Sequence, residues 1–303
     1  MNDDNIIHPD ELNEPKVIGG QLPENEYKGT SECALHIHGE SGICMPKGAI
    51  ERIKAYLVNT GISVGKSDAD VIQTAMASLG VTKESELLEH CDIREHIGES
   101  AAKRILDTFF KSIGPADSTA LLDNFNIDET LERWSKLSSD LFKAKFYHVP
   151  FQMIDFAKMN TELAKLDVAQ LMRDGYDCFG VVLNTDVHSG KGKHWFCLYG
   201  DLKHKGTEKD PIVLEYFNSS GNAAVSEVRD WLAETEHELR KNGIEATIYR
   251  SVPRRLQQSQ TECGVWSLMY ILSRLKGRPP DWFYRNKVND EDMIDVRAFL
   301  FRK

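Results

Sequence analysis

The hydrophobic pattern of residues 263–275 predicts a buried helix. Apolar residues recur at helical spacing and also fill much of the opposite side: Val265, Leu268, Met269, Leu272 and Leu275 on the first side, Trp266, Tyr270 and Ile271 on the second. A helix that is apolar on nearly all faces packs inside a core. Gly277 and the two prolines that follow it give this helix an end. Cys263 therefore lies at the N-terminus of a buried helix.

Upstream of this helix, the apolar pattern alternates between helical and strand periods. Helical patterns cover about 157–173 and about 225–242. Three β-type runs are close enough to pair as an antiparallel meander, and a fourth strand comes later: 179–183, 194–199, 211–217 and 245–252. This order of elements predicts an α+β fold, with helices packed on a sheet.

The first third of the chain shows a different pattern. Residues 1–48 have no sustained period and predict an acidic, flexible N-terminal segment. Apolar stripes then predict three helices between 49 and 113, the second capped by Ser67 and the third ended by Gly114-Pro115. We expect three parts: the segment 1–48, an all-helical N-terminal arm at 49–118 and a core at 119–303.

Composition narrows the classes of protein that fit. Lys and Arg number 37 against 47 Asp and Glu, so the net charge is −10, and we expect no nucleic-acid partner. The six cysteines form no CxxC pair or metal-ligand cluster, so we expect no disulfide framework, no metal and no cofactor, and a reducing compartment. The N-terminus does not resemble a signal peptide, and we expect no membrane span. Composition leaves the oligomeric state open.

The position of Cys263 is compatible with two roles. A free cysteine is often a small core residue. At a helix N-terminus, however, the helix dipole and free N–H groups favour the thiolate, so we expect a lowered thiol pKa and a nucleophile. Position alone does not separate these two roles.

Three other residues would complete a thiol protease site with Cys263. His194 opens a predicted strand, and Asn218 ends the next one, so a hairpin would place the imidazole beside an amide that fixes its tautomer. Gln257 lies six residues before Cys263 and carries an amide that can donate to an oxyanion. Taken singly, His194 fits a surface histidine and Asn218 a turn residue.

Together, His194-Trp195, Asn218, Gln257 and Cys263-Gly264 resemble the active site of one clan of cysteine proteases. This clan contains the ubiquitin-like-protein proteases and the adenovirus proteinase. Within 119–303, further segments resemble the polyprotein-processing protease family of African swine fever virus: Leu121–Leu131, Val182–Asp186, Glu215–Ser219, Ser259–Gly264 and Asp290–Arg302. The resemblance implies a papain-like or adenain-like core, with a central mixed sheet and the nucleophile on a buried helix.

The resemblance also implies roles and a substrate. Cys263 would be the nucleophile, His194 the general base and acid, Asn218 the orienting residue and Gln257 the oxyanion donor. The family implies cleavage after Gly-Gly in viral structural polyproteins, in the host cytoplasm and the virion. Trp195 would wall a tunnel that admits only glycine, and Asn184 would hold substrate backbone.

Three alternatives stay open: a deconjugase of ubiquitin-like modifiers, an acyltransferase on the same fold and an inactive scaffold.

The charged run 203–210 is either a longer turn or part of the substrate rim. Gly19-Gly20 is a candidate site of self-cleavage.

Overall fold

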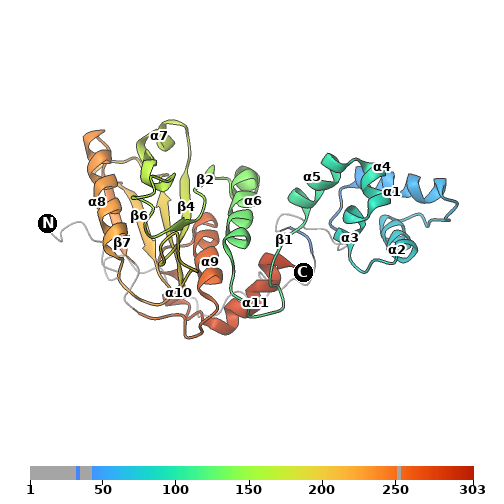
Figure 1. The fold of residues 1–303 in the computed structure, drawn as a ribbon. Coiled ribbons are helices and arrows are strands. Elements are labelled where there is room, and N and C mark those ends of the chain that lie inside the picture. Colours follow the sequence, from blue (N-terminus) through green and yellow to red (C-terminus); the bar gives the residue numbers. More distant parts are fainter. Residues whose placement is uncertain (1–31, 35–42, 251–253) are drawn as a thin grey trace. The chain divides into compact units, whose positions relative to one another are not determined.

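A six-stranded mixed sheet forms the centre of the larger of two units, Ser118–Arg297, in the computed structural model (Figure 1). The structure describes residues 32–34, 43–250 and 254–303. The sheet order is β2-β4-β5-β6-β7, with β3 also paired to β4: β2 Phe146–His148, β3 Gln152–Met153, β4 Cys178–Asn184, β5 Trp195–Asp201, β6 Ile212–Phe217 and β7 Ala246–Arg250. The predicted antiparallel meander is confirmed by β4, β5 and β6, whereas the outer strands run parallel to their neighbours. The α+β fold is confirmed.

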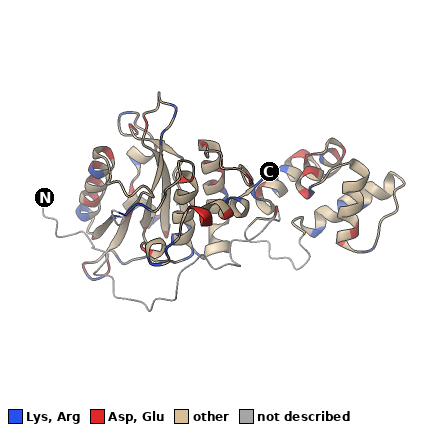
Figure 2. Cartoon of the chain, turned by 90° about the horizontal axis from the view of Figure 1, so that it is seen from below, with Lys and Arg blue, Asp and Glu red and all other residues tan. Residues whose placement is uncertain are grey.

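Alternate strand residues point to opposite faces of the sheet, so these almost fully buried strands have an apolar surface on both faces. Helices cover each of the two faces. One face packs its apolar side chains with α8, Ser226–Lys241, and α7, Val168–Arg173. The other face meets α9, Cys263–Leu275, whose residues are all buried, as the hydrophobic pattern predicted. On that face Phe217 of β6 stacks on Tyr270 of α9 with ring centroids 4.2 Å apart. Figure 1 shows the sheet between α8 and α9, and the ribbon colours of Figure 2 show acidic and basic residues along α8.

The helix predicted at about 157–173 is interrupted. Only a 3-10 turn, Leu163–Lys165, and α7 are helical there. Asn160 adopts a positive φ of 52°, and the Asp167 carboxylate accepts from the backbone N–H of Gln170 to start α7 anew. An Asp favours such a cap over a helix interior, so the apolar pattern overestimated the length of this helix.

The remaining helices of the larger unit complete its core. They are α6 Asn124–Phe142, α10 Trp282–Arg285 and α11 Asp290–Leu300, of which α11 continues beyond this unit. Helix α6 packs against β2 and α9. Within the described ranges, no helix is both long and apolar enough to cross a membrane.

The smaller unit contains the described residues up to Asp117 together with Ala298–Lys303. Its helices are α1 Lys47–Asn59, α2 Asp68–Leu79, α3 Glu84–Glu89, α4 Cys91–Ile97 and α5 Glu99–Phe109. Ser67 caps α2, as predicted. The helix predicted to run from 97 to 113 ends earlier: α5 stops at Phe109, and β1, Ser112–Ile113, pairs in parallel with β8, Phe301–Arg302. The sequence pattern missed the short helices α3 and α4.

Two features of the smaller unit differ from the expected domain plan. The last six residues of the chain, Ala298–Lys303, belong to this unit, whereas the sequence placed them in the core. Cys33 and Cys44 form a disulfide, although their spacing of 11 residues gave no signal for one. Gly19-Gly20 and most of the predicted flexible segment lie outside the described residues.

Candidate active site

The thiol of Cys263 lies at the start of α9 among backbone donors. Burial raises its pKa above the ordinary value, although N–H groups of Trp195, Gly264 and Cys263 itself lower it. The expected lowering of the thiol pKa is therefore wrong in its net direction, because burial outweighs the helix terminus. Gly264 is closely packed, since a Cβ there would lie 3.0 Å from the Cβ of Leu122 and would require that side chain to shift.

His194 ends the loop between β4 and β5 and directly precedes β5. Trp195, the residue after His194, donates its backbone N–H to the thiol of Cys263. The loop is held by the side chain of Asn184, whose oxygen accepts from the N–H groups of Asp186 and Lys193 at 3.0 and 2.9 Å. The carbonyl of His194 accepts the backbone N–H of the residue after Asn184. The start of β5 therefore places the residue after His194 against the thiol.

Asn218 follows β6 and faces His194. The Nε2 of His194 is 2.8 Å from the amide oxygen of Asn218. Burial lowers the pKa of His194 below its ordinary value, and the hydrogen bond to Asn218 opposes this shift. The expectation that the hairpin would place these residues side by side is confirmed, because β5 and β6 pair in antiparallel register up to Cys197 and Phe217.

Gln257 lies beside the same turn. Its backbone N–H donates to the carbonyl of Ser219, and its side-chain oxygen accepts the Ser219 hydroxyl at 2.8 Å. Its Nε2 donates to the carbonyl of Ser259 at 3.0 Å, and the residue is only 4% exposed. A side-chain amide nitrogen carries two hydrogens, so a second N–H remains for an oxyanion.

Two acidic residues hold the segment between Gln257 and Cys263. Asp290 of α11 accepts from the backbone N–H groups of Gln258 and Ser259 at 2.7 and 2.6 Å and from the Trp266 indole at 2.9 Å. Glu262, fully buried, accepts two hydrogen bonds from Arg297 at 2.8 and 2.9 Å. The sequence pattern pointed to neither residue, because the partners named here lie 24 to 35 residues away along the chain.

The two predicted substrate-binding residues are both buried. Trp195 is 8% exposed, its indole donates to the carbonyl of Leu122 at 3.0 Å, and its ring meets Phe151 edge-on. Asn184 is 2% exposed, and its amide oxygen is used inside the loop as described above. Asn184 thus holds the loop that leads to His194. Its contact with substrate stays a prediction.

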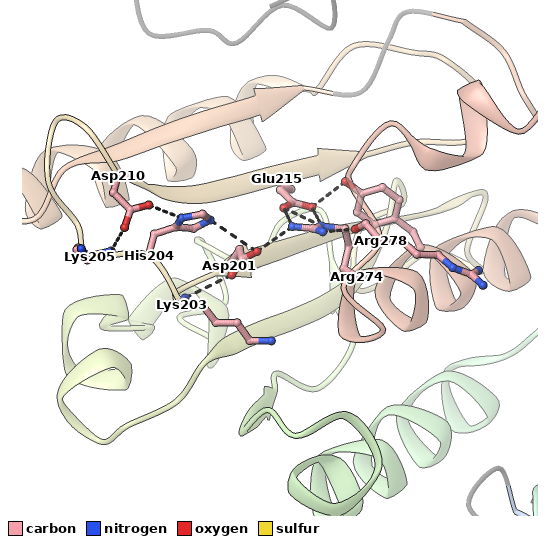
Figure 3. A network of polar contacts seen from close by, with 9 residues as sticks. Asp201, Lys203, His204, Lys205, Asp210, Glu215, Arg274 and Arg278 are labelled. Carbon is pink, nitrogen blue, oxygen red and sulfur yellow. Dashed lines mark hydrogen bonds and ion pairs between the residues drawn. The ribbon is translucent and has the colours of Figure 1, made fainter. Parts of the chain in front are cut away.

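The charged turn after β5 lies away from the candidate catalytic residues His194 and Asn218. Because β5 and β6 are antiparallel, the turn that joins them lies at the opposite end of these strands from His194 and Asn218. There, Asp210 accepts from His204 at 2.7 Å (Figure 3). The turn is therefore not part of the substrate rim, which leaves the alternative of a longer turn.

A buried ionic network lies between this turn and α9. Arg274 of α9 donates to Glu215 at 2.8 to 3.0 Å and to Asp201 at 2.9 Å, and Tyr270 also donates to Glu215 (Figure 3). Burial raises the pKa of the fully buried Glu215, and Arg274 opposes that shift. The network fixes α9 against β5 and β6 at a distance from the thiol.

Comparisons with known proteins agree with this fold. No family model matches the chain. The chain is 31% identical over 287 residues to a SUMO-1 cysteine protease S273R of African swine fever virus, covering 90% of this chain and 95% of the relative. It also matches the crystal structure of the ASFV pS273R protease with a TM-score of 0.72 and 29% identity, covering 93% and 99% of the two chains. A putative thiol protease R355 of Acanthamoeba polyphaga mimivirus is 22% identical over 209 residues, 69% of this chain and 65% of that protein.

The protein is therefore a cysteine protease with an α+β core of this type. More particularly, the chain belongs to the S273R family of cysteine proteases.

Proposed function

We propose that the protein cleaves viral structural polyproteins after Gly-Gly during virion maturation, with a Cys263-His194-Asn218 site. The observation that carries the site is the contact between His194 and Asn218 at 2.8 Å, beside the backbone N–H of Trp195 that reaches the Cys263 thiol. Cleavage of this kind would act at viral assembly sites in the host cytoplasm and in the virion.

The chemistry follows from which groups carry protons. Because burial raises the thiol pKa and lowers the imidazole pKa, the resting pair is a neutral thiol and a neutral imidazole. His194 takes the thiol proton as the sulfur attacks the scissile carbonyl carbon. The oxyanion accepts hydrogen bonds from the N–H of Cys263 and from Nε2 of Gln257. The imidazolium then protonates the leaving amine, and water hydrolyses the thioester with His194 again as the base.

Restriction to glycine would come from Trp195. Its indole N–H donates to the carbonyl of Leu122, its ring meets Phe151 edge-on, and its backbone N–H donates to the nucleophile. We expect this fixed indole to leave little space for a Cβ on the substrate residue whose carbonyl is attacked.

The test is peptide cleavage with defined substitutions. A Gly-Gly-Xaa peptide should be cut after the second glycine, and Gly-Ala-Xaa and Ala-Gly-Xaa peptides should be cut at least about tenfold more slowly. Cys263→Ala should abolish cleavage. Cys91→Ala is the matched control, because Cys91 is a free cysteine on the surface of the smaller unit. Cleavage that persists in Cys263→Ala protein would contradict the proposed nucleophile.

A second candidate is removal of a ubiquitin-like modifier, which the name of the viral relative, SUMO-1 cysteine protease, favours. A SUMO-1 fusion and a set of viral structural polyproteins, digested in parallel and sequenced at the new N-termini, separate the two substrates. Faster cleavage of the fusion would favour the deconjugase. Acetyl transfer from acetyl-CoA without peptide cleavage would contradict both.

A further inference from the structure

The hydrogen bonds around Asn218 determine which way its amide faces. The carbonyl of Asn222 only accepts, so Tyr216, whose Oη lies 3.0 Å away, donates its single proton there. The same Oη is 3.0 Å from the Asn218 amide and is left to accept. The amide atom that faces Tyr216 is therefore the nitrogen.

The opposite end of the amide gives the same answer independently. The backbone N–H of Ser220 lies 3.0 Å from the other amide atom of Asn218, and a backbone N–H only donates. The Ser220 hydroxyl is 2.8 Å from that atom as well. This atom is the oxygen, so the Nε2 of His194, also 2.8 Å from it, carries a hydrogen and donates.

We propose that Tyr216 is a positioning residue that, together with the backbone of Ser220, sets the tautomer of His194. With its proton on Nε2, neutral His194 presents an unprotonated Nδ1 as the base for Cys263. This inference rests on the proposed roles of His194, Asn218 and Cys263. No charged group is involved at any step of this chain, so it selects the tautomer without forming an ion pair with the imidazolium.

The surroundings of Tyr216 keep its hydroxyl in place. The residue is 4% exposed, and its ring packs on Phe196 with centroids 5.6 Å apart. Burial raises the pKa of Tyr216 to about 12, so the phenol remains a donor at the pH values at which a histidine acts as a base. Removing the hydroxyl would leave the Asn218 amide nitrogen, which is buried, without this acceptor.

The first test is the tautomer itself. Nitrogen-15 NMR of histidine-labelled Cys263→Ala protein, above the pKa of His194, should show a protonated Nε2 and an unprotonated Nδ1. Adding Tyr216→Phe should shift the equilibrium toward a mixture of tautomers. A wild-type tautomer protonated on Nδ1, or an unchanged spectrum in Tyr216→Phe protein, would overturn the proposal.

The second test is a kinetic cycle in the enzyme with Cys263 intact. Tyr216→Phe should lower kcat about 5- to 20-fold with KM changed less than about twofold, because only the orientation of the base is affected. In an Asn218→Asp background, the same substitution should change kcat less than about twofold, because both carboxylate oxygens accept and no orientation has to be selected. An equal loss in both backgrounds would show a merely structural role for Tyr216.

Tyr249→Phe is the matched control. Tyr249 is a buried tyrosine of the neighbouring strand β7, and its hydroxyl has no hydrogen-bond partner among the described residues. Its substitution should leave both the His194 spectrum and kcat unchanged. The NMR test needs no enzymatic activity, so the tautomer proposal can fail while peptide cleavage and its loss in Cys263→Ala protein still support the proposed function. Equally, the predicted tautomer can be observed in a protein that does not cleave the Gly-Gly-Xaa peptide.

Discussion

The two ends of the central sheet are held by different kinds of polar contact. At the catalytic end, His194, Asn218 and Tyr216 are linked by neutral hydrogen bonds. At the other end, Asp201, Glu215 and Arg274 form a buried ionic network. Trp195 and Asp201, the first and last residues of β5, are separated by about 20 Å at the usual rise of a strand.

The difference separates the two tasks of the core. Charged partners fix α9 against the sheet, and their fields also shift the pKa of neighbouring groups. A charged partner beside His194 would raise its pKa and favour an ion pair with the thiol. Neutral partners orient the imidazole and leave it able to take a proton. The ionic contacts therefore stabilise the fold at a distance from the chemistry.

The largest effect is expected at the catalytic end. His194→Ala removes the base and should lower kcat/KM by at least about 10³-fold, while the free energy of unfolding changes by about 1 kcal/mol or less. Peptide hydrolysis and urea denaturation measure the two quantities. If the variant kept a tenth of the activity, His194 would not be the base.

The next effect is on stability, at the ionic end. Glu215→Gln leaves Arg274 with Asp201 as its remaining carboxylate partner and should destabilise the protein by about 3 kcal/mol. Replacing both partners, as Glu215→Leu with Arg274→Met, should recover much of this loss, because it removes both buried charges.

Glu132→Gln is the control for this substitution, since Glu132 pairs with Lys136 on the surface and both side chains are more than half exposed. This substitution should lower the free energy of unfolding by less than about 0.5 kcal/mol. Equal urea midpoints for Glu215→Gln and Glu132→Gln would show that the buried network does not hold α9.

A smaller effect is expected from the orienting residue. Asn218→Ala should lower kcat/KM by about 10- to 100-fold, because the imidazole loses its orientation but the base itself remains. Steady-state kinetics on the Gly-Gly-Xaa peptide measure it. A loss as large as that of His194→Ala would mean that the neutral partner contributes more than orientation.

The smallest effect is a displacement of the pH profile. The base must be unprotonated, so activity rises as the pH passes the pKa of His194. Burial lowers this pKa, so the acid limb of kcat/KM should lie below the ordinary histidine value of about 6.5. Asn218→Asp adds a negative charge and should move the limb to higher pH. An unchanged limb in Asn218→Asp protein would contradict the contact between residues 194 and 218.

Local patterns predicted the elements that carry the site. The apolar faces of residues 263–275 gave α9, and short apolar runs gave β4, β5 and β6, because strands covered on both faces are apolar at successive positions. Antiparallel pairing of β5 and β6 then followed from their short separation, which brought His194 next to Asn218. The resemblance of these segments to a protease family supplied the roles.

Other features depended on partners distant in the sequence. Asp290 holds the segment before Cys263 from 31 and 32 residues away, and Arg302 bonds Ser85 across 217 residues. The disulfide between Cys33 and Cys44 likewise depends on where the chain turns. Side-chain identity alone does not specify such pairs, because many carboxylates and cysteines of the same chain are equally suitable partners.

The sequence by itself determined which groups are available for chemistry and at which strand or helix end each one lies. Only the tertiary structure decided their protonation. The helix terminus predicted a low thiol pKa, but the burial of Cys263 reverses the net shift, and desolvation depends on everything packed around the sulfur. The orientation of the Asn218 amide was decided in the same way, by the three-dimensional arrangement of a phenol and a backbone N–H around it.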